Sequence, residues 1–216
     1  WYEQEGSPVQ TTYVPDDNFE QALIDLGYDD VIDDYVLTAN ISGVTSLDVG
    51  EKEISDLTGI AGFTALTSLS CDNNQLTALD VSNNTALTSL YCFVNPLTAL
   101  DVSANTALTT LFCYNNQLTA LDVSNNTALI TLSCYTNQLT ALDVSANTAL
   151  TILYCYGNAL TSLDVSANTA LSNLRCHSNQ LTALDVSANT ALVYLYCYNN
   201  QLTSLDLSTN TALRTL

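Results

Sequence analysis

The sequence predicts a β-rich solenoid in which 21-residue coils, each with two short parallel β-strands, stack behind an α-helical N-terminal cap. From Leu66 onward the sequence repeats itself every 21 residues without a break in register. Within each copy, apolar and polar residues alternate as they do in half-buried strands. The residues before about position 44 do not follow the repeat and contain one amphipathic helical pattern.

Residues 1–15 are expected to form an extended N-terminal lead that contains Pro8 and Pro15. The chain begins at Trp1 without the charged and apolar regions of a signal peptide, so an export signal has been removed or never existed. We expect the former, in a protein that is secreted or exposed on the cell surface.

Residues 16–43 are predicted to form a helical, acidic cap. Asp17 and Glu20 have the spacing of a capping box, and Gly27 would end the helix. Because the open end of a solenoid must be covered, we expect the helix to seal the first coil. Its apolar face would consist of Phe19, Ala22, Leu23 and Leu26.

Four aspartates follow this helix, namely Asp29, Asp30, Asp33 and Asp34. Clustered carboxylates are ligands that Ca²⁺ prefers, although the spacing is not that of an EF-hand loop. Two interpretations stay open, a calcium site and a solvated acidic helix end. We expect no other metal or cofactor.

Residues 44–65 resemble a degenerate first repeat, and residues 66–216 contain seven full copies and the start of an eighth. A typical copy, LTTLFCYNNQLTALDVSNNTA at 108–128, has two similar halves. Leu111 and Cys113 would point inward in the first half, and Leu121 and Val123 in the second. Asparagine pairs at 115–116 and 125–126 suit the tight turns between them, because Asn tolerates left-handed backbone.

The two halves, LTTLFCYNN and LTALDVSNN, resemble the LxxLxLxxN signature of the leucine-rich repeat family. They are most similar to the short, doubled bacterial variant known as the IRREKO type. The segment VPDDNFEQALIDLG also resembles caps of secreted bacterial leucine-rich repeat proteins. The resemblance implies recognition of proteins, glycans or surfaces, without pointing to one ligand.

The seven cysteines fall 21 residues apart at inward positions where the family has Leu: Cys71, Cys92, Cys113, Cys134, Cys155, Cys176 and Cys197. An odd number at core positions does not indicate a disulfide framework. We predict a column of reduced thiols that act as small apolar side chains. No CxxC pair supports a metal site.

The charge balance excludes several classes of function. The 22 acidic and 3 basic residues give a net charge of -19, which repels nucleic acids and anionic membranes. No apolar run reaches the ~18 residues of a membrane helix, so no membrane insertion is expected. With one histidine, His177, and no nucleophile motif, we expect no enzyme.

The outward positions of the second predicted strand are nearly constant and include a column of aspartates: Asp80, Asp101, Asp122, Asp143, Asp164, Asp185 and Asp206. Neighbouring carboxylates repel by roughly 1 kcal/mol in water. Either hydrogen bonds from Ser or backbone stabilise them, or cations lie between them.

The outward positions of the first strand vary from coil to coil and collect every aromatic ring after Phe63. Contiguous exposed rings usually mark a binding site, although ring stacking between coils would also stabilise the sheet. The predicted ligand-binding residues are Tyr91, Phe93, Phe112, Tyr114, Tyr135, Tyr154, Tyr156, Arg175, His177, Tyr194, Tyr196 and Tyr198.

These observations predict a non-catalytic recognition module of a secreted or surface-exposed bacterial protein, which binds a protein partner through its aromatic strand face. A glycan-binding adhesin or substrate-capture subunit would use the same tyrosines. A structural spacer in a larger surface assembly is the third hypothesis.

Overall fold

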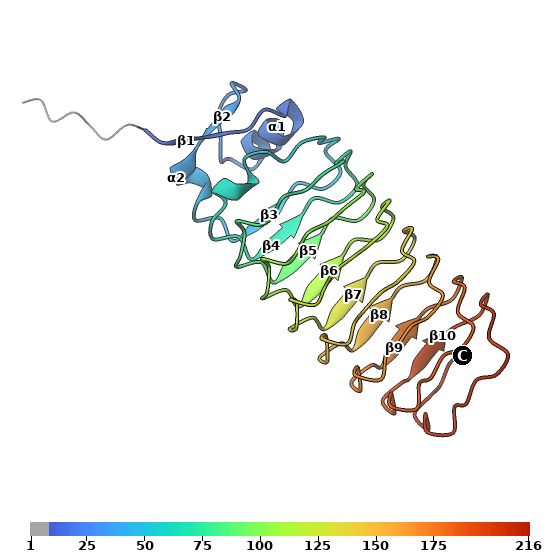
Figure 1. Cartoon of the computed structure of the whole chain (residues 1–216). Helices are drawn as coiled ribbons and strands as arrows, with labels where there is room; N and C mark the ends of the chain where they lie inside the picture. Colours follow the sequence, from blue (N-terminus) through green and yellow to red (C-terminus); the bar gives the residue numbers. More distant parts are fainter. Residues whose placement is uncertain (1–8) are drawn as a thin grey trace, which may run out of the picture.

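The computed structural model describes residues 9–216, so the first eight residues of the predicted lead lie outside the described part of the chain. The predicted solenoid is confirmed. Figure 1 shows the coils stacked along one axis behind a cap at the N-terminal end, with the strands aligned on one side.

One parallel sheet of eight strands runs the length of the solenoid in chain order, from β3 to β10. Equivalent residues of neighbouring coils pair directly, as Leu90 does with Leu111. The central leucine of each strand is buried, and the next coil covers it, which is how short coils build one core. The strands are β3 (Ser46–Asp48), β4 (Ser68–Ser70), β5 (Ser89–Tyr91), β6 (Thr110–Phe112), β7 (Thr131–Ser133), β8 (Ile152–Tyr154), β9 (Asn173–Arg175) and β10 (Tyr194–Tyr196).

The prediction of a second strand in each coil is wrong. Among the described residues, the second halves contain one isolated bridge, Asp80 to Asp101, and otherwise turns, bends and irregular backbone. The backbone N–H of Asn126 donates to the carbonyl of Val123, and that of Leu129 to Asn126. These local bonds curl the chain, so the second half cannot carry a continuous ladder to its neighbours.

Two columns of asparagine side chains replace the missing ladder. In the strand-side column, Asn116 donates to the carbonyls of Cys92 and Cys113 and accepts from the N–H of Leu97. In the turn-side column, Asn126 donates to the carbonyls of Val102 and Asn105 of the preceding coil. The predicted turn role holds for Asn115, whose φ is 52°. Asn116 and Asn126 are instead buried, and their side chains donate hydrogen bonds to the preceding coil.

The cap contains a small sheet as well as helices. β1 (Thr11–Tyr13) pairs antiparallel with β2 (Tyr35–Leu37), and the helices are α1 (Asp17–Asp25) and α2 (Thr38–Ile41). A 3-10 turn, η1 (Ile60–Gly62), lies before the first full repeat. The lead is therefore extended over β1 because it belongs to a sheet.

The predicted capping box is wrong, because Asp16 caps α1. Its Oδ1 accepts from the N–H groups of Asn18 and Phe19, at 3.0 Å each. Its Oδ2 accepts from the N–H and Oγ of Ser55, which attaches the helix to the first coil. Gly27 does follow the helix with a left-handed φ of 79°. Leu26 is 45% exposed, so the apolar face is shorter than predicted.

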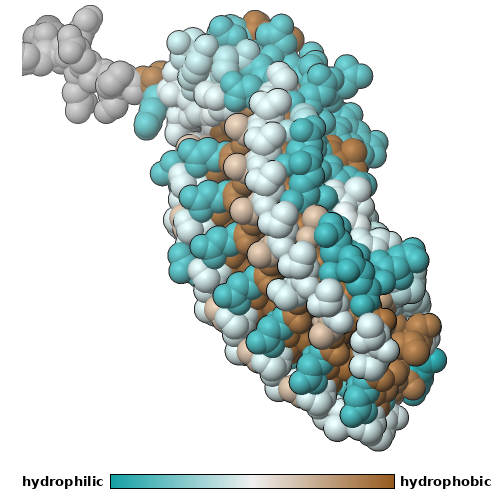
Figure 2. Space-filling view, turned by 45° about the vertical axis from the view of Figure 1, so that its right-hand side comes forward, coloured by the Kyte–Doolittle hydropathy of each residue, from teal (hydrophilic) through white to brown (hydrophobic). Residues whose placement is uncertain are grey.

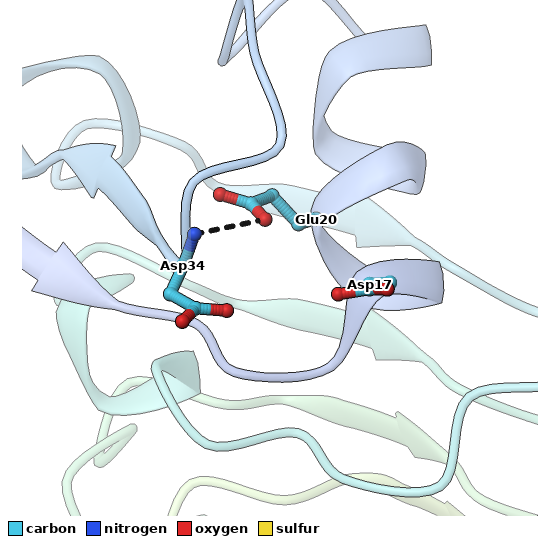
Figure 3. Close-up of side chains that lie close together, drawn as sticks. All are labelled: Asp17, Glu20 and Asp34. Carbon is cyan, nitrogen blue, oxygen red and sulfur yellow. Dashed lines mark hydrogen bonds between the residues drawn. The ribbon is translucent and has the colours of Figure 1, made fainter.

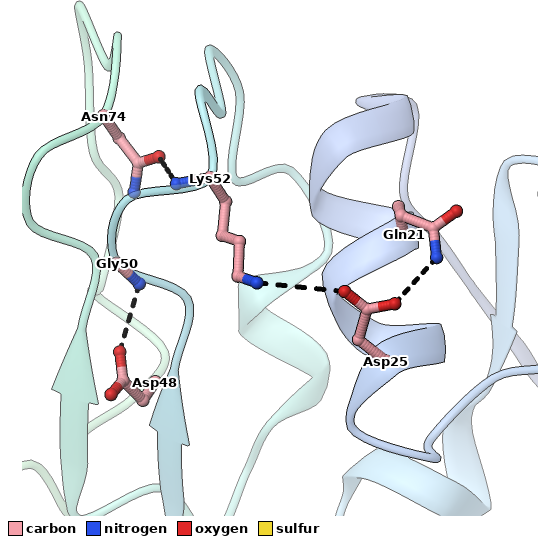
Figure 4. A network of polar contacts seen from close by, with 6 residues as sticks. All are labelled: Gln21, Asp25, Asp48, Gly50, Lys52 and Asn74. Carbon is pink, nitrogen blue, oxygen red and sulfur yellow. Dashed lines mark hydrogen bonds and ion pairs between the residues drawn. The ribbon is translucent and has the colours of Figure 1, made fainter.

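Polar contacts connect the cap to the first turn of the solenoid (Figure 4). Lys52 lies 3.8 Å from Asp25, and Gln21 donates to the same carboxylate from one helical turn away. The N–H of Lys52 also donates to Asn74, the first member of the strand-side asparagine column. One residue thus joins α1 to the repeat array.

Candidate functional site

The outward side chains of β4–β10 and of the residue two positions after each strand form one surface, which we name the aromatic face. Strand alternation puts the leucines and cysteines inside and these side chains outside. The structure places all twelve predicted residues on this face, on neighbouring coils. Most are half-buried, and Tyr194 and Tyr198 are 42% and 54% exposed.

Six rings form a continuous stack along the solenoid. Neighbouring centroids are 4.2–4.4 Å apart and the ring planes differ by 9–20°. The separation is close to the strand spacing of a sheet, so the parallel register dictates the stack. The members are Phe93, Tyr114, Tyr135, Tyr156, His177 and Tyr198.

A second column lies beside the stack and is less regular. Tyr91 and Phe112 meet edge to face at 5.3 Å. Further along, the guanidinium of Arg175 lies 4.5 Å from the ring centroid of Tyr154 and 5.1 Å from that of Tyr196. Both separations are within the range of cation–π attraction.

The pKa shifts of Tyr114, Tyr135, Tyr156 and His177 all favour the neutral form of the ring. Burial, followed by the neighbouring Tyr135, raises the pKa of Tyr156 to about 12. Burial and then the charge of Arg175 lower the pKa of His177. Of the outward positions that make up the aromatic face, only Asp72 and Arg175 carry a formal charge. The aromatic face is largely neutral on a strongly acidic protein.

A depression of about 480 Å³ lies at the N-terminal end of the aromatic face. It combines carboxylates with aromatic rings, because the first two strands carry small side chains where later strands carry rings. Its lining includes Asp48, Ser68, Ser70, Asp72, Tyr91, Phe93, Phe112 and Tyr114.

Sequence reasoning missed how completely the rings cover one another. Each internal ring of the stack has a neighbour on both faces, which leaves its edge as the accessible part. The signal was available, since rings at the same position of successive copies must stack once the register is parallel. No pattern in the sequence indicated the hydrogen bond that Asn173 Nδ2 donates to the Tyr154 hydroxyl, at 2.9 Å.

The aspartate column on the other side is hydrogen-bonded. In every copy, Asp Oδ1 accepts from the N–H of the serine two residues later, at 2.8–2.9 Å. Hydrogen bonding from Ser145 holds the pKa of Asp143 below its ordinary value. The bonded explanation of this column therefore has direct support.

The acidic residues of the cap do not gather as the calcium hypothesis requires. Within residues 9–216, the carboxylates close enough to share a cation are Asp17, Glu20 and Asp34 (Figure 3). Glu20 is fully buried and accepts from the backbone N–H groups of Asp33, Asp34 and Tyr35. Asp29, Asp30 and Asp33 lie outside this group.

The cysteines form an internal ladder of free thiols. Six are buried, and Cys197 is partly exposed. Burial raises the pKa of Cys134 to about 12 and that of Cys176 to about 12. The thiols thus pack as small apolar groups, as predicted.

Alkylation should distinguish the exposed end of this ladder from its interior. We expect iodoacetamide at pH 8 to modify Cys197 in the native protein, because only the thiolate reacts and the other six thiols are buried. Mass spectrometry after addition of guanidinium should show modification of all seven cysteines. Rapid native modification of Cys134 would contradict the buried ladder.

The repeat also orders the outer surface into lines. Figure 2 shows rows of residues of similar hydropathy that follow the long axis of the solenoid on one side of the molecule. Among residues 9–216, no helix has both the length and the apolar character needed to cross a bilayer.

Stacked short coils, a single parallel sheet, inward leucines and asparagine columns together define a leucine-rich repeat protein. The 21-residue class remains a prediction that this geometry fits. A family model described as the LVIVD repeat matches residues 71–93 and 113–137, two segments in the register of the repeat.

Two solved structures from Listeria monocytogenes are similar to the chain. The functional domain of InlJ, described as including a cysteine ladder, is 37% identical, with a TM-score of 0.57 over 94% of this chain and 56% of that one. Internalin C2 shares the fold, with a TM-score of 0.89, 22% identity and coverage of 98% and 99%.

One curated relative extends this similarity in sequence. Internalin J of Listeria monocytogenes serotype 4b is 45% identical over 72 residues, which are 33% of this chain and 8% of the relative. The chain thus matches a small part of that protein's length.

Proposed function

We propose that this chain is a non-catalytic recognition module of an exported bacterial protein, and that it binds a protein partner through the aromatic face. The observation that carries the proposal is the concentration of rings on one side of the sheet. The aspartate side keeps nearly the same residues in each copy, whereas the aromatic face varies from strand to strand. A surface that served stability alone would not need this variation.

Ring stacking and binding are compatible on this face. Each stacked pair contributes about 0.5–1.5 kcal/mol, which holds the rings rigid before a partner arrives. A preformed surface loses little conformational entropy on binding, and tyrosine and arginine are common hot-spot residues. The similarity in sequence to InlJ and internalin J supports a surface recognition role.

The geometry favours a protein over a glycan. Sugars usually stack on a free ring face, but Tyr135 at 4.2 and 4.3 Å contacts Tyr114 and Tyr156 on its two sides. Ring edges and hydroxyls remain for contact, and these suit the mixed polar and apolar surface of a protein.

The test is a panning of displayed peptides and small folded domains against the full chain. We expect selected binders to lose about 30-fold in affinity for Tyr135→Ala, the size of a hot-spot loss. Tyr135→Phe, which retains the ring, should stay within a few-fold. Tyr13→Ala removes a paired, 48% exposed tyrosine of the cap and is the matched control.

Circular dichroism and thermal melting should show that each variant is folded. Selected binders whose affinity is unchanged by Tyr135→Ala would show that the aromatic face is not the binding site. Specific glycan-array binding that is lost in Tyr154→Ala and Tyr156→Ala would support the adhesin instead.

A further inference from the structure

Arg175 is the one cation of the aromatic face, and its side chain has no acidic partner in the described part of the chain. Within residues 9–216, the only ion pair joins Lys52 to Asp25 in the cap region. The guanidinium of Arg175 is instead fixed between the rings of Tyr154 and Tyr196. No carboxylate of residues 9–216 thus pairs with this arginine, although the chain has 22 acidic residues.

The terminal nitrogens of this arginine are available to a ligand. The buried Nε of Arg175 has no hydrogen-bond partner among the described residues. Its terminal nitrogens reach solvent and donate no bond within the same part of the chain. Asn173 Oδ1 and His177 Nδ1, from the two positions that flank Arg175 on its own outward row, are also buried and without partners.

We propose that Arg175 is the centre of a carboxylate-binding subsite that receives an Asp or Glu side chain of the protein partner. This inference rests on the proposed function. A planar guanidinium donates two parallel hydrogen bonds to a carboxylate, and the flanking rings hold that plane in place before contact. Pre-orientation reduces the entropy lost when the bonds form.

The charge of the chain defines the partner further. A net charge of -19 repels a polyanion at long range, whereas the contact at Arg175 acts within a few ångströms. The rings around the guanidinium offer apolar edges. The partner segment should therefore be mainly apolar or aromatic and carry a single carboxylate at this point.

The experiment pans a displayed library of random short peptides against the full chain and measures affinities of the selected peptides. We expect Arg175→Gln to weaken binding by about 10- to 100-fold, which is the usual range for a charge-assisted bidentate contact. Arg175→Lys should be intermediate, because it retains the charge and loses the planar fork. Arg214→Gln, an exposed arginine outside the aromatic face, is the matched control and should change little.

A second readout locates the contact. Replacing the acidic residue of a selected peptide by its amide should lose as much affinity as Arg175→Gln, and should add nothing to that variant's loss. The chain has two arginines, so their Nε–H signals can be followed individually by NMR. The signal of Arg175 should shift with the acidic peptide and stay in place with its amide analogue.

The outcomes separate this inference from the proposed function. Peptides that require Tyr135 but bind Arg175→Gln with wild-type affinity would overturn the subsite and leave the aromatic face as a binding site. Peptides that require neither residue, or a selection that yields no peptide, would count against both. Binding of sialylated glycans that depends on Arg175 would assign the subsite to an anionic sugar instead.

Discussion

Asn126→Ala is expected to lower the free energy of unfolding by about 2–3 kcal/mol, because it removes two buried hydrogen bonds between coils. The side chain is fully buried and its Nδ2 lies 2.9 Å from each of the carbonyl oxygens of Val102 and Asn105. The carbonyls of Val102 and Asn105 would keep only their local turn donors, the N–H groups of Asn105 and Leu108. The next coil cannot compensate, since the Nδ2 of Asn147 binds the carbonyls of Val123 and Asn126 itself. Urea unfolding followed by circular dichroism measures the change.

The neighbouring residue supplies the control. Asn125 is exposed and makes one long contact, 3.4 Å to the carbonyl of Ser103. Several other copies have Ala at this position, for example Ala146. Asn125→Ala should therefore change stability by less than about 0.5 kcal/mol. Equal effects of the two substitutions would show that the turn-side asparagine column does not hold the coils together.

Glu20→Gln is expected to destabilise the cap by about 2–3 kcal/mol. The buried carboxylate accepts three backbone N–H groups at 3.0–3.1 Å, those of Asp33, Asp34 and Tyr35. A glutamine would keep one acceptor oxygen and point an NH₂ group at the remaining donors. Hydrogen bonds to a charged group are worth about 1.5–3 kcal/mol each, and their loss is only partly offset here.

Hydrogen exchange should place this effect in the cap. We expect faster exchange of the amides at 33–37 and in β1, with little change in β6–β8, because each coil of a solenoid depends mainly on its neighbours. Asp17→Asn is the matched control, since Asp17 is exposed. Uniform destabilisation of the whole chain by Glu20→Gln would contradict a local role.

The cap also shows why its details were hard to predict. Asp16, Asp17 and Glu20 are all acidic and all lie near the start of α1, so local spacing permits several capping patterns. Asp16 is the cap because Ser55, 39 residues away in sequence, is also bound to it. Glu20 is turned toward the loop before β2, a contact that no local pattern specifies. Long-range partners decided both positions.

The sequence was sufficient to predict which residues form the aromatic face, but it predicted only some of the contacts among them. The 21-residue register puts Tyr114, Tyr135 and Tyr156 at the same position of successive coils, which is sufficient to place them on one side. The position of Arg175 between two rings follows from side-chain packing across three strands, which a sequence does not specify.

The repeat by itself determined the solenoid, the inward leucines and thiols, and the outward rings, because a strict period makes every coil pack on an identical neighbour. The tertiary structure alone decided that each coil has one strand, that buried asparagines join the remaining backbone, and which carboxylate caps α1. Hydrogen-bond partners in adjacent coils decide these features, and an asparagine in a turn looks the same in sequence as one that donates across the stack.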